Sequence, residues 1–120
     1  MHWIADVRCS QGLADVDAVQ GFMDAVVERL RLHRIDGYVH TFSNGGTIYG
    51  PGISAHTLIA ESHIQVHTAP ERELLQLDIH SCRNFDIGVI KKLVDQSAGS
   101  SKVIHTFSFL VLTEVITVTQ

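Results

Sequence analysis

Three segments of alternating apolar and polar residues follow one another closely in this sequence, at 53–60, 62–68 and 74–81. A period of two residues is typical of strands with one buried face. A single residue separates the first two segments, and the turn at 69–72 lies between the last two. Connections this short cannot hold a parallel crossover, so consecutive strands must pair antiparallel. The sequence therefore predicts an antiparallel sheet in which neighbours along the chain are neighbours in space.

Two other segments have the spacing of amphipathic helices. The first is expected to begin at its N-cap Asp15 and to end at Arg34, before Asp36-Gly37, with Arg29 and Arg31 also near the negative end of the helix dipole. Its apolar stripe is Val16, Val19, Met23, Val26, Val27 and Leu30. The second helix is marked by Ile87, Ile90, Leu93 and Val94, with Asn84 or Asp86 as its cap.

Further strands are expected at 2–8, at 38–43 and within 102–118, where the β-favouring residues form one long strand or two short ones. The order is therefore β-α-β-β-β-β-α-β, with a possible ninth element at the end. We predict an α+β fold, a two-layer sandwich of a mainly antiparallel sheet with two amphipathic helices on one face. No composition break or repeat occurs, so residues 1–120 are expected to form a single domain.

Charge and composition exclude several classes of function. Lys and Arg number 9 against 13 Asp and Glu, and a net charge of −4 argues against binding nucleic acid through its phosphates. No apolar run approaches the roughly 20 residues of a membrane helix, and the N-terminus does not resemble a signal peptide. Cys9 and Cys82 are too few for a disulfide scaffold. We expect a small soluble cytoplasmic protein without nucleic-acid or membrane partners.

The 8 histidines make chemistry near neutral pH worth seeking. If the second and third of the alternating segments pair, one surface of the sheet gathers a polar patch of His63, Gln65, His67, Asp78, His80 and Cys82. We predict no metal site, because His63 and His67 lie about 13 Å apart along a strand and no CxxC or HExxH motif occurs. Nucleophilic catalysis by Cys82 with a neighbouring histidine is an alternative, although a lone cysteine is more often an inert packing residue.

Four short motifs carry a more specific signal. Residues 51–54 read Pro-Gly-Ile-Ser, 61–63 Glu-Ser-His, 67–71 His-Thr-Ala-Pro-Glu and 77–82 Leu-Asp-Ile-His-Ser-Cys. In this spacing the chain resembles the small prokaryotic S-adenosylmethionine decarboxylase proenzymes. Their pattern is Gly-apolar-Ser, Glu-Ser-His, His-Thr-aromatic-Pro-Glu and Leu-Asp-apolar-apolar-Thr-Cys-Gly. The resemblance covers nearly the whole chain, since length, helix positions and element order also agree.

The resemblance implies a pyruvoyl enzyme that makes its own cofactor. Ser62 would attack the carbonyl of Glu61 and cut the chain into a β chain, residues 1–61, and an α chain that begins at residue 62. That residue would become the pyruvoyl group, which forms a Schiff base with the substrate amine. By the same resemblance Ser54 and His67 assist processing, and Cys82 returns a proton to the product. The resemblance also implies a homodimer with active sites at the subunit interface.

Three features depart from the family pattern. Ala69 replaces the aromatic residue, His80-Ser81-Cys82-Arg83 replaces Phe-Thr-Cys-Gly, and the loop 43–52 is longer. We predict a self-processing decarboxylase whose substrate is S-adenosylmethionine, converted to its decarboxylated form for polyamine and spermidine synthesis. His80 and Arg83 suit a carboxylate better than a sulfonium, so arginine or ornithine is the alternative substrate. A non-processing homologue that only binds a ligand is the alternative from another class.

Overall fold

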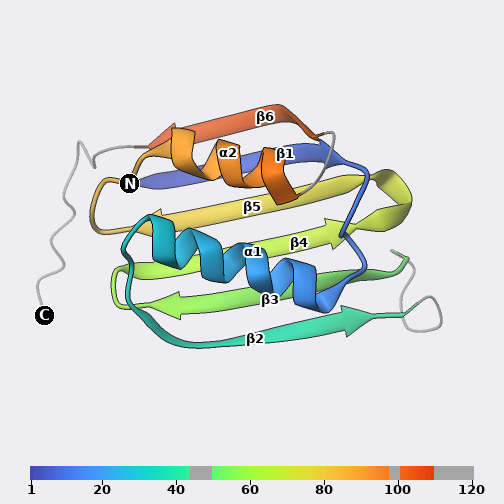
Figure 1. Cartoon of the computed structure of the whole chain (residues 1–120), viewed down its shortest axis with the longest axis horizontal. Coiled ribbons are helices and arrows are strands. Elements are labelled where there is room, and N and C mark those ends of the chain that lie inside the picture. The colour runs from blue at the N-terminus through green and yellow to red at the C-terminus, as the bar shows by residue number, and fades with distance from the viewer. Residues whose placement is uncertain (44–49, 98–100, 110–120) are drawn as a thin grey trace, which may run out of the picture.

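The computed structural model describes residues 1–43, 50–97 and 101–109 of the chain. Within these ranges the elements are β1 His2–Cys9, α1 Val16–Arg29, β2 Arg34–Phe42, β3 Gly52–Ile59, β4 Ser62–Ala69, η1 Pro70–Arg72, β5 Leu74–Ser81, α2 Ile87–Ser97 and β6 Ser101–Phe109. The strands form one sheet in the order β2-β3-β4-β5-β1-β6, with every neighbouring pair antiparallel (Figure 1). In the part of the chain so described, no helix is long and apolar enough to span a membrane.

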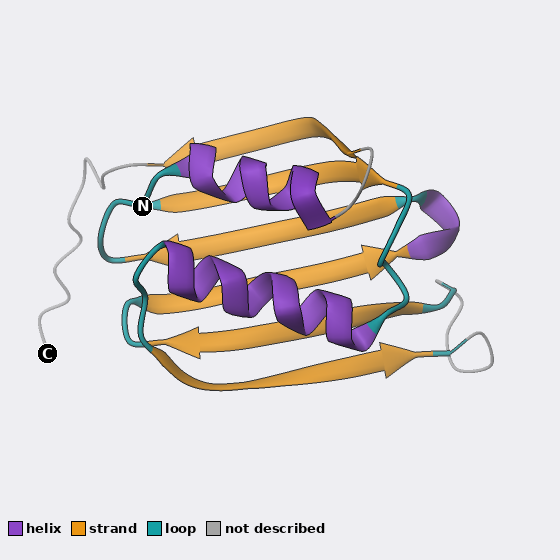
Figure 2. Ribbon diagram, in the orientation of Figure 1, coloured by secondary structure: helices purple, strands orange, loops and turns teal. Residues whose placement is uncertain are grey.

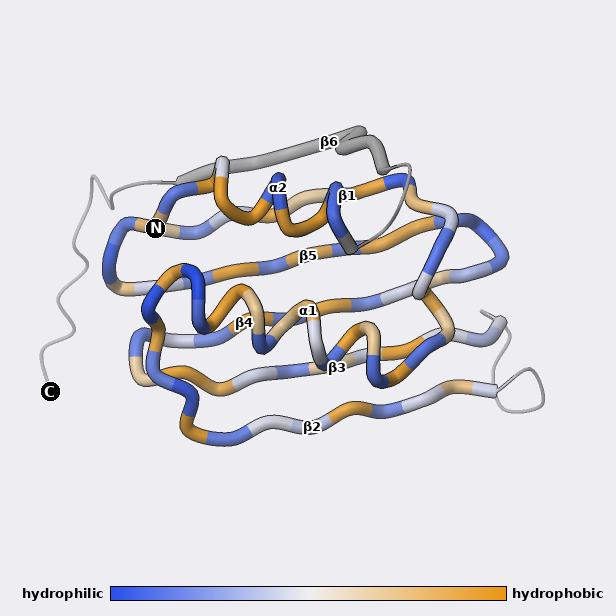
Figure 3. Tube along the Cα trace, in the orientation of Figure 1, coloured by the Kyte–Doolittle hydropathy of each residue, from blue (hydrophilic) through white to orange (hydrophobic). Residues whose placement is uncertain are grey.

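Both helices lie on one face of this sheet, which confirms the predicted two-layer α+β fold (Figure 2). The strands alternate accordingly: along β5, Leu75, Leu77 and Ile79 are buried under the helices, while Gln76 and His80 are exposed on the other side. Hydropathy alternates along the traces of the central strands in the same way (Figure 3). Burial of these apolar side chains between sheet and helices is the main source of stability.

The sheet surface that faces away from the helices is called the open face below. The strand registers place on it His2, Ile4 and Asp6 of β1, Tyr38, His40 and Phe42 of β2, Ser54, His56 and Leu58 of β3, His63, Gln65 and His67 of β4, and Gln76, Asp78 and His80 of β5. The predicted patch thus forms from His63, Gln65, His67, Asp78 and His80, because β4 and β5 pair with His63 opposite His80, whereas Cys82 lies beyond the end of β5.

The first helix ends earlier than its apolar spacing predicts. Asp15 caps it as expected, with its carboxylate accepting hydrogen bonds from the next turn, but the helix stops at Arg29. Arg31 has a φ of 55°, and the amides of Arg31 and Leu32 bond back to the carbonyls of Glu28 and Val27. This is a Schellman closure, which usually has glycine in the left-handed position. Because arginine occupies that position, no glycine marks the end of the helix in the sequence.

Strand β2 consequently begins at Arg34 and runs through Asp36 and Gly37, although this pair is a turn signal that predicts the end of the helix. In the second helix, Asp86 is the cap, since its carboxylate accepts a hydrogen bond from the Gly88 amide at 2.8 Å. Strand β6 confirms a strand at the start of segment 102–118, and the rest of that segment lies outside the described residues. The same holds for the middle of the longer loop before β3, residues 44–49.

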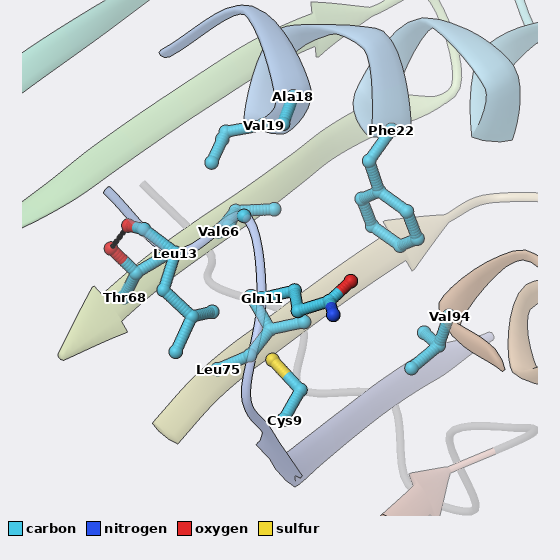
Figure 4. Close-up of a pocket in the computed structure, with 11 residues that line it drawn as sticks. Cys9, Gln11, Leu13, Ala18, Val19, Phe22, Val66, Thr68, Leu75 and Val94 are labelled. Carbon is cyan, nitrogen blue, oxygen red and sulfur yellow. Dashed lines mark hydrogen bonds between the residues drawn. The ribbon is translucent and has the colours of Figure 1, made fainter. Parts of the chain in front are cut away.

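Thr68, the threonine of the His-Thr-Ala-Pro-Glu motif, is a structural residue. Its hydroxyl is fully buried, donates to the Leu13 carbonyl at 2.6 Å and accepts from the Ile53 amide at 3.0 Å (Figure 4). It borders a small apolar cavity of about 40 Å³ on the helix side of the sheet. Opposite it, a Cβ on Gly52 would stand 2.2 Å from the Thr68 carbonyl oxygen, so only glycine fits there. Both motif residues therefore hold β3 against β4.

Candidate active site

The Glu61–Ser62 peptide bond lies in a tight hairpin turn. Strand β3 ends at Ile59 and β4 begins at Ser62, and these two residues face each other across the ladder. Only Ala60 and Glu61 form the loop, and neither is a residue that two-residue hairpins favour. Ser62 has a φ of 155°, a value that L-residues other than glycine rarely adopt. The backbone is thus strained at the bond where the sequence predicts cleavage.

This φ angle also brings the serine side chain toward the preceding carbonyl. Viewed along the N–Cα bond of an L-residue, Cβ is rotated by about 120° from the carbonyl carbon of the same residue. At a φ of 155°, the torsion angle between Ser62 Cβ and the carbonyl carbon of Glu61 is therefore only about 35°. In an ordinary strand the same torsion is about 120°. Attack of Oγ on that carbon closes a five-membered ring, and a small torsion is what such a ring requires. The strain therefore has a chemical use.

The Glu61 carbonyl oxygen is already held by a donor. The Cys82 amide, immediately after the end of β5, bonds to it at 2.9 Å. A donor aimed at this oxygen stabilises the negative charge that develops on it when the carbonyl is attacked. The thiol-bearing residue is exposed, and its position beside Glu61 puts it next to Ser62. The structure thus brings together three of the predicted site residues: Glu61, Ser62 and Cys82.

The side chain of Glu61 is buried and fixed by two basic residues. His33 Nδ1 lies 2.6 Å from Oε1, the His33 amide donates to Oε2, and the Arg83 guanidinium donates to Oε1 at 3.2 Å. The hydrogen bond from the His33 side chain is the main cause that lowers the pKa of Glu61 to about 2. Arg83 also donates to the carbonyl of Arg31, the left-handed residue that closes α1. Sequence reasoning missed His33, which lies in a connection and belongs to no motif.

Histidines surround the Ser62 hydroxyl on the open face. Its Oγ lies 3.1 Å from Nδ1 of His63 and 3.4 Å from Nδ1 of His80. Asp78 Oδ1 lies 3.3 Å from His63 Nε2 and 2.7 Å from His2 Nε2. Partial desolvation of the otherwise exposed ring, followed by its closeness to His2, His63 and the N-terminus, lowers the pKa of His80, so this ring is neutral at neutral pH. The site therefore offers nitrogen acceptors to the serine hydroxyl.

Ser54 and His67 form a separate pair. Their side chains are hydrogen-bonded, with 2.6 Å between Oγ and Nδ1, because β3 and β4 place these residues opposite each other. However, His67 is five residues beyond Ser62 on the extended strand β4, a distance of about 16 Å. A side chain cannot bridge that distance. Within one chain, the five predicted site residues therefore fall into two groups at opposite ends of β4.

A hollow adjoins the second group. A cavity of about 290 Å³ is lined by Phe42, His67, Ala69 and Arg72, among others, and the Phe42 and His67 rings are 6.3 Å apart between centroids. Its size is near the lower limit for small-molecule sites. Among the described residues, no group of three or more His, Cys, Asp or Glu side chains is placed to hold a metal ion.

Comparisons with known proteins agree with the motifs. A profile of the family described as S-adenosylmethionine decarboxylase matches residues 1–108. An S-adenosylmethionine decarboxylase proenzyme of Archaeoglobus fulgidus is 31% identical over 70 residues, covering 58% of this chain and 57% of that protein. One of Thermoplasma acidophilum is 33% identical over 84 residues, covering 68% and 60%. The matches thus span somewhat less than two thirds of these relatives.

A solved structure shares the fold over nearly its full length. The crystal structure of the adenosylmethionine decarboxylase from Aquifex aeolicus superimposes with a TM-score of 0.70 and covers 97% of this chain and 95% of that one. Sequence identity between the two is 19%, so this likeness supports the architecture and leaves the chemistry to be argued from the residues.

Proposed function

Because the chain belongs to the S-adenosylmethionine decarboxylase family, whose members are pyruvoyl-dependent carboxy-lyases, we propose that it is a self-processing decarboxylase that cuts itself between Glu61 and Ser62. One observation carries the proposal: the strained Ser62 presents its side chain to a carbonyl whose oxygen is already bonded to the Cys82 amide. A serine hydroxyl beside a polarised carbonyl in a strained turn is the arrangement that an acyl shift requires.

The cut proceeds through the chain's own atoms. Ser62 Oγ bonds to the Glu61 carbonyl carbon, its proton passes to the Ser62 nitrogen, and that nitrogen leaves, which converts the amide into an ester. A base then removes the Cα proton of residue 62, and the main-chain carboxylate of Glu61 departs from Cβ as the leaving group. Water hydrolyses the resulting dehydroalanine with loss of ammonia, leaving a pyruvoyl group at the start of the α chain. This group supplies the electron sink for loss of carbon dioxide from an amine substrate.

The residues around position 62 fit a group of this kind. Polar groups lie close to residue 62, with neutral His80 and the Cys82 main chain beside it, and the exposed Cys82 thiol is free to deliver a proton to the decarboxylated product. Glu61, which becomes the C-terminus of the β chain, stays fixed by His33 and Arg83. The leaving carboxylate is thereby kept near the new α-chain terminus.

The proposed active form is a homodimer in which each site is built from both copies. The support is the distance of about 16 Å along β4 that separates Ser54 and His67 from Ser62 in one chain. A two-fold axis across the middle of β4, with two open faces packed together, exchanges the ends of that strand. It places the Ser54–His67 pair of each copy beside Ser62 of the other, and both sites become complete at once.

The proposed substrate is S-adenosylmethionine, supported by Phe42, whose ring lines the cavity beside His67 and offers a face for an adenine or a sulfonium. A second candidate is an amino acid such as arginine or ornithine. It is favoured by Ala69, which removes the family's aromatic residue from the same cavity, and by Arg72, whose charge suits a carboxylate.

An intact mass spectrum of freshly purified protein tests the proposal. We expect two chains, residues 1–61 and a pyruvoyl-blocked chain from 62 to 120. A single chain of 120 residues that stays uncut on incubation would instead favour a non-catalytic binding protein. Carbon dioxide release from S-adenosylmethionine, arginine and ornithine, each assayed with the cut protein, then assigns the substrate.

A further inference from the structure

Ser62, His63 and Asp78 form a continuous hydrogen-bonded chain on the open face. Ser62 Oγ is 3.1 Å from His63 Nδ1, and His63 Nε2 is 3.3 Å from Asp78 Oδ1. An ionised carboxylate only accepts hydrogen bonds, so His63 carries a proton on Nε2, and in the neutral ring this is its only nitrogen-bound proton. Its Nδ1 is then the unprotonated nitrogen, and it faces the serine hydroxyl. The tautomer is thus set by Asp78 in the form that accepts a proton from Ser62.

The ring of His63 is also held from its other sides. His56 stacks on it at a centroid distance of 5.8 Å and an interplanar angle of 23°. The side chain of His63 is mostly shielded from solvent. His2 lies 2.7 Å from the same Asp78 oxygen, which anchors the carboxylate between two rings. A base that is oriented before the reaction loses little entropy when the proton moves.

We propose that His63 is the general base that takes the proton from Ser62 during self-cleavage, and that Asp78 positions it. This rests on the self-processing proposed above and assigns a catalyst to its first step. His63 Nδ1 accepts the hydroxyl proton as Oγ bonds to the Glu61 carbonyl carbon. The same proton then passes from Nδ1 to the Ser62 nitrogen as the carbon–nitrogen bond breaks, so His63 ends in its starting form. The arrangement is that of a serine, histidine and carboxylate triad, directed at the chain's own backbone.

His80 is the competing base, because its Nδ1 is also near Ser62 Oγ, at 3.4 Å. Among the hydrogen bonds of the described residues, however, the Asp78 carboxylate bonds to His63 and His2. Asp78 therefore fixes the tautomer of His63. The geometry thus distinguishes the two histidines, and substitution of each one separates their roles.

The test follows cleavage of the full-length chain by intact mass after rapid purification. Loss of a general base slows a step by about 10²–10⁴-fold, so we expect His63→Gln to cut at least about 100-fold more slowly than wild type. Asp78→Asn should slow cutting too, because an amide no longer dictates the tautomer. His63→Gly should regain speed when imidazole is added, which a purely structural defect would not do. Asp24→Asn, on the exposed side of α1 and away from the open face, serves as the control and should cut normally.

Hydroxylamine, which cleaves esters, locates the blocked step. If His63 acts in the acyl shift, the uncut His63→Gln chain contains the original amide and resists hydroxylamine. Cutting of His63→Gln at the wild-type rate, or accumulation of a hydroxylamine-sensitive ester, overturns the assignment. If a thermal melt shows that both His63→Gln and Asp78→Asn are unfolded, the imidazole rescue of His63→Gly becomes the deciding result. If the wild-type protein itself stays uncut, the proposed function fails. If the wild-type protein is cut, the behaviour of the variants tests only the role of His63.

Discussion

The main-chain amide of Cys82 donates a 2.9 Å hydrogen bond to the carbonyl oxygen of Glu61. This bond joins the end of β5 to the β3–β4 turn, and it is made by the backbone of a residue whose thiol has a separate proposed use. The two roles of Cys82 can therefore be separated by mutation, since a side-chain substitution leaves the amide in place.

We predict that Cys82→Ala still cuts itself but loses decarboxylation. The amide that stabilises the oxyanion is retained, while the thiol that would protonate the product is gone. Mass spectrometry reports the cut, and carbon dioxide release reports the turnover. Full turnover in this variant would remove the thiol from the mechanism. Failure to cut would show that the side chain also matters for processing.

Substitutions of Ser62 test both the nucleophile and the strain. Ser62→Ala and Ser62→Gly should each remain a single uncut chain, because neither has a hydroxyl. Glycine adopts a φ of 155° without penalty, so Ser62→Gly should be more stable to urea than Ser62→Ala by about 1–2 kcal/mol. Equal stabilities would mean that the turn is relaxed, and both fragments in either variant would exclude Ser62 as the nucleophile.

Mixed dimers test whether each site is shared between copies. A His67→Ala chain alone should cut poorly, and a Ser62→Ala chain alone cannot cut. Co-expressed, they form a hybrid in which Ser62 of the first chain meets His67 of the second, so the His67→Ala chain should now be cut. Differently tagged chains and mass spectrometry identify the product. A site contained in one chain would show no such complementation, and His40→Ala in place of His67→Ala is the control.

The pKa of Glu61 gives a prediction about acid stability. A carboxyl whose folded pKa of about 2 lies below its ordinary 4.5 stabilises the fold above pH 4.5, and this contribution is lost as the pH falls toward 2. Because His33 is the main cause, His33→Ala should raise the pKa of Glu61 toward 4.5, as followed by NMR in the uncut Ser62→Ala protein. The difference in free energy of unfolding between the Ser62→Ala protein and the same protein with His33→Ala added should then shrink as the pH falls from 4.5 to 2.

A control for this prediction is Arg83→Gly, which restores the family residue. The Arg83 guanidinium lies 3.2 Å from Glu61 Oε1, whereas His33 Nδ1 lies 2.6 Å from it and is the main cause of the low pKa, so the pKa should rise less than with His33→Ala. A larger rise with Arg83→Gly than with His33→Ala would contradict this order.

Much of the fold follows from local patterns. The strands at 53–60, 62–68 and 74–81 alternate clearly because one face of each is buried, and their short turns leave only one pairing. The end of α1 escaped prediction because Arg31 adopts a conformation that its residue type does not announce. The motifs predict the five site residues. Their division into two groups follows from the extended form of β4, because residues 62 and 67 lie too far apart along it to meet.

His33 escaped for a different reason. It acts on Glu61 across 28 positions of sequence and comes from a connection without periodicity, so only the folded backbone brings the two together. His63 was visible as a member of the Glu-Ser-His motif, but its link to Asp78 depends on the exact register between β4 and β5. Contacts of this kind are set by tertiary structure.

The strand order has a consequence for the protein after the proposed cut. The fragment 1–61 contributes β1, β2 and β3, and the fragment 62–120 contributes β4, β5 and β6, yet β1 lies between β5 and β6. The two pieces are therefore interleaved, with ladders joining them at β3–β4, β5–β1 and β1–β6. Breaking the peptide bond at the hairpin frees the new ends to move apart locally, but it does not release either piece. Only a denaturant that dismantles the whole sheet should separate them.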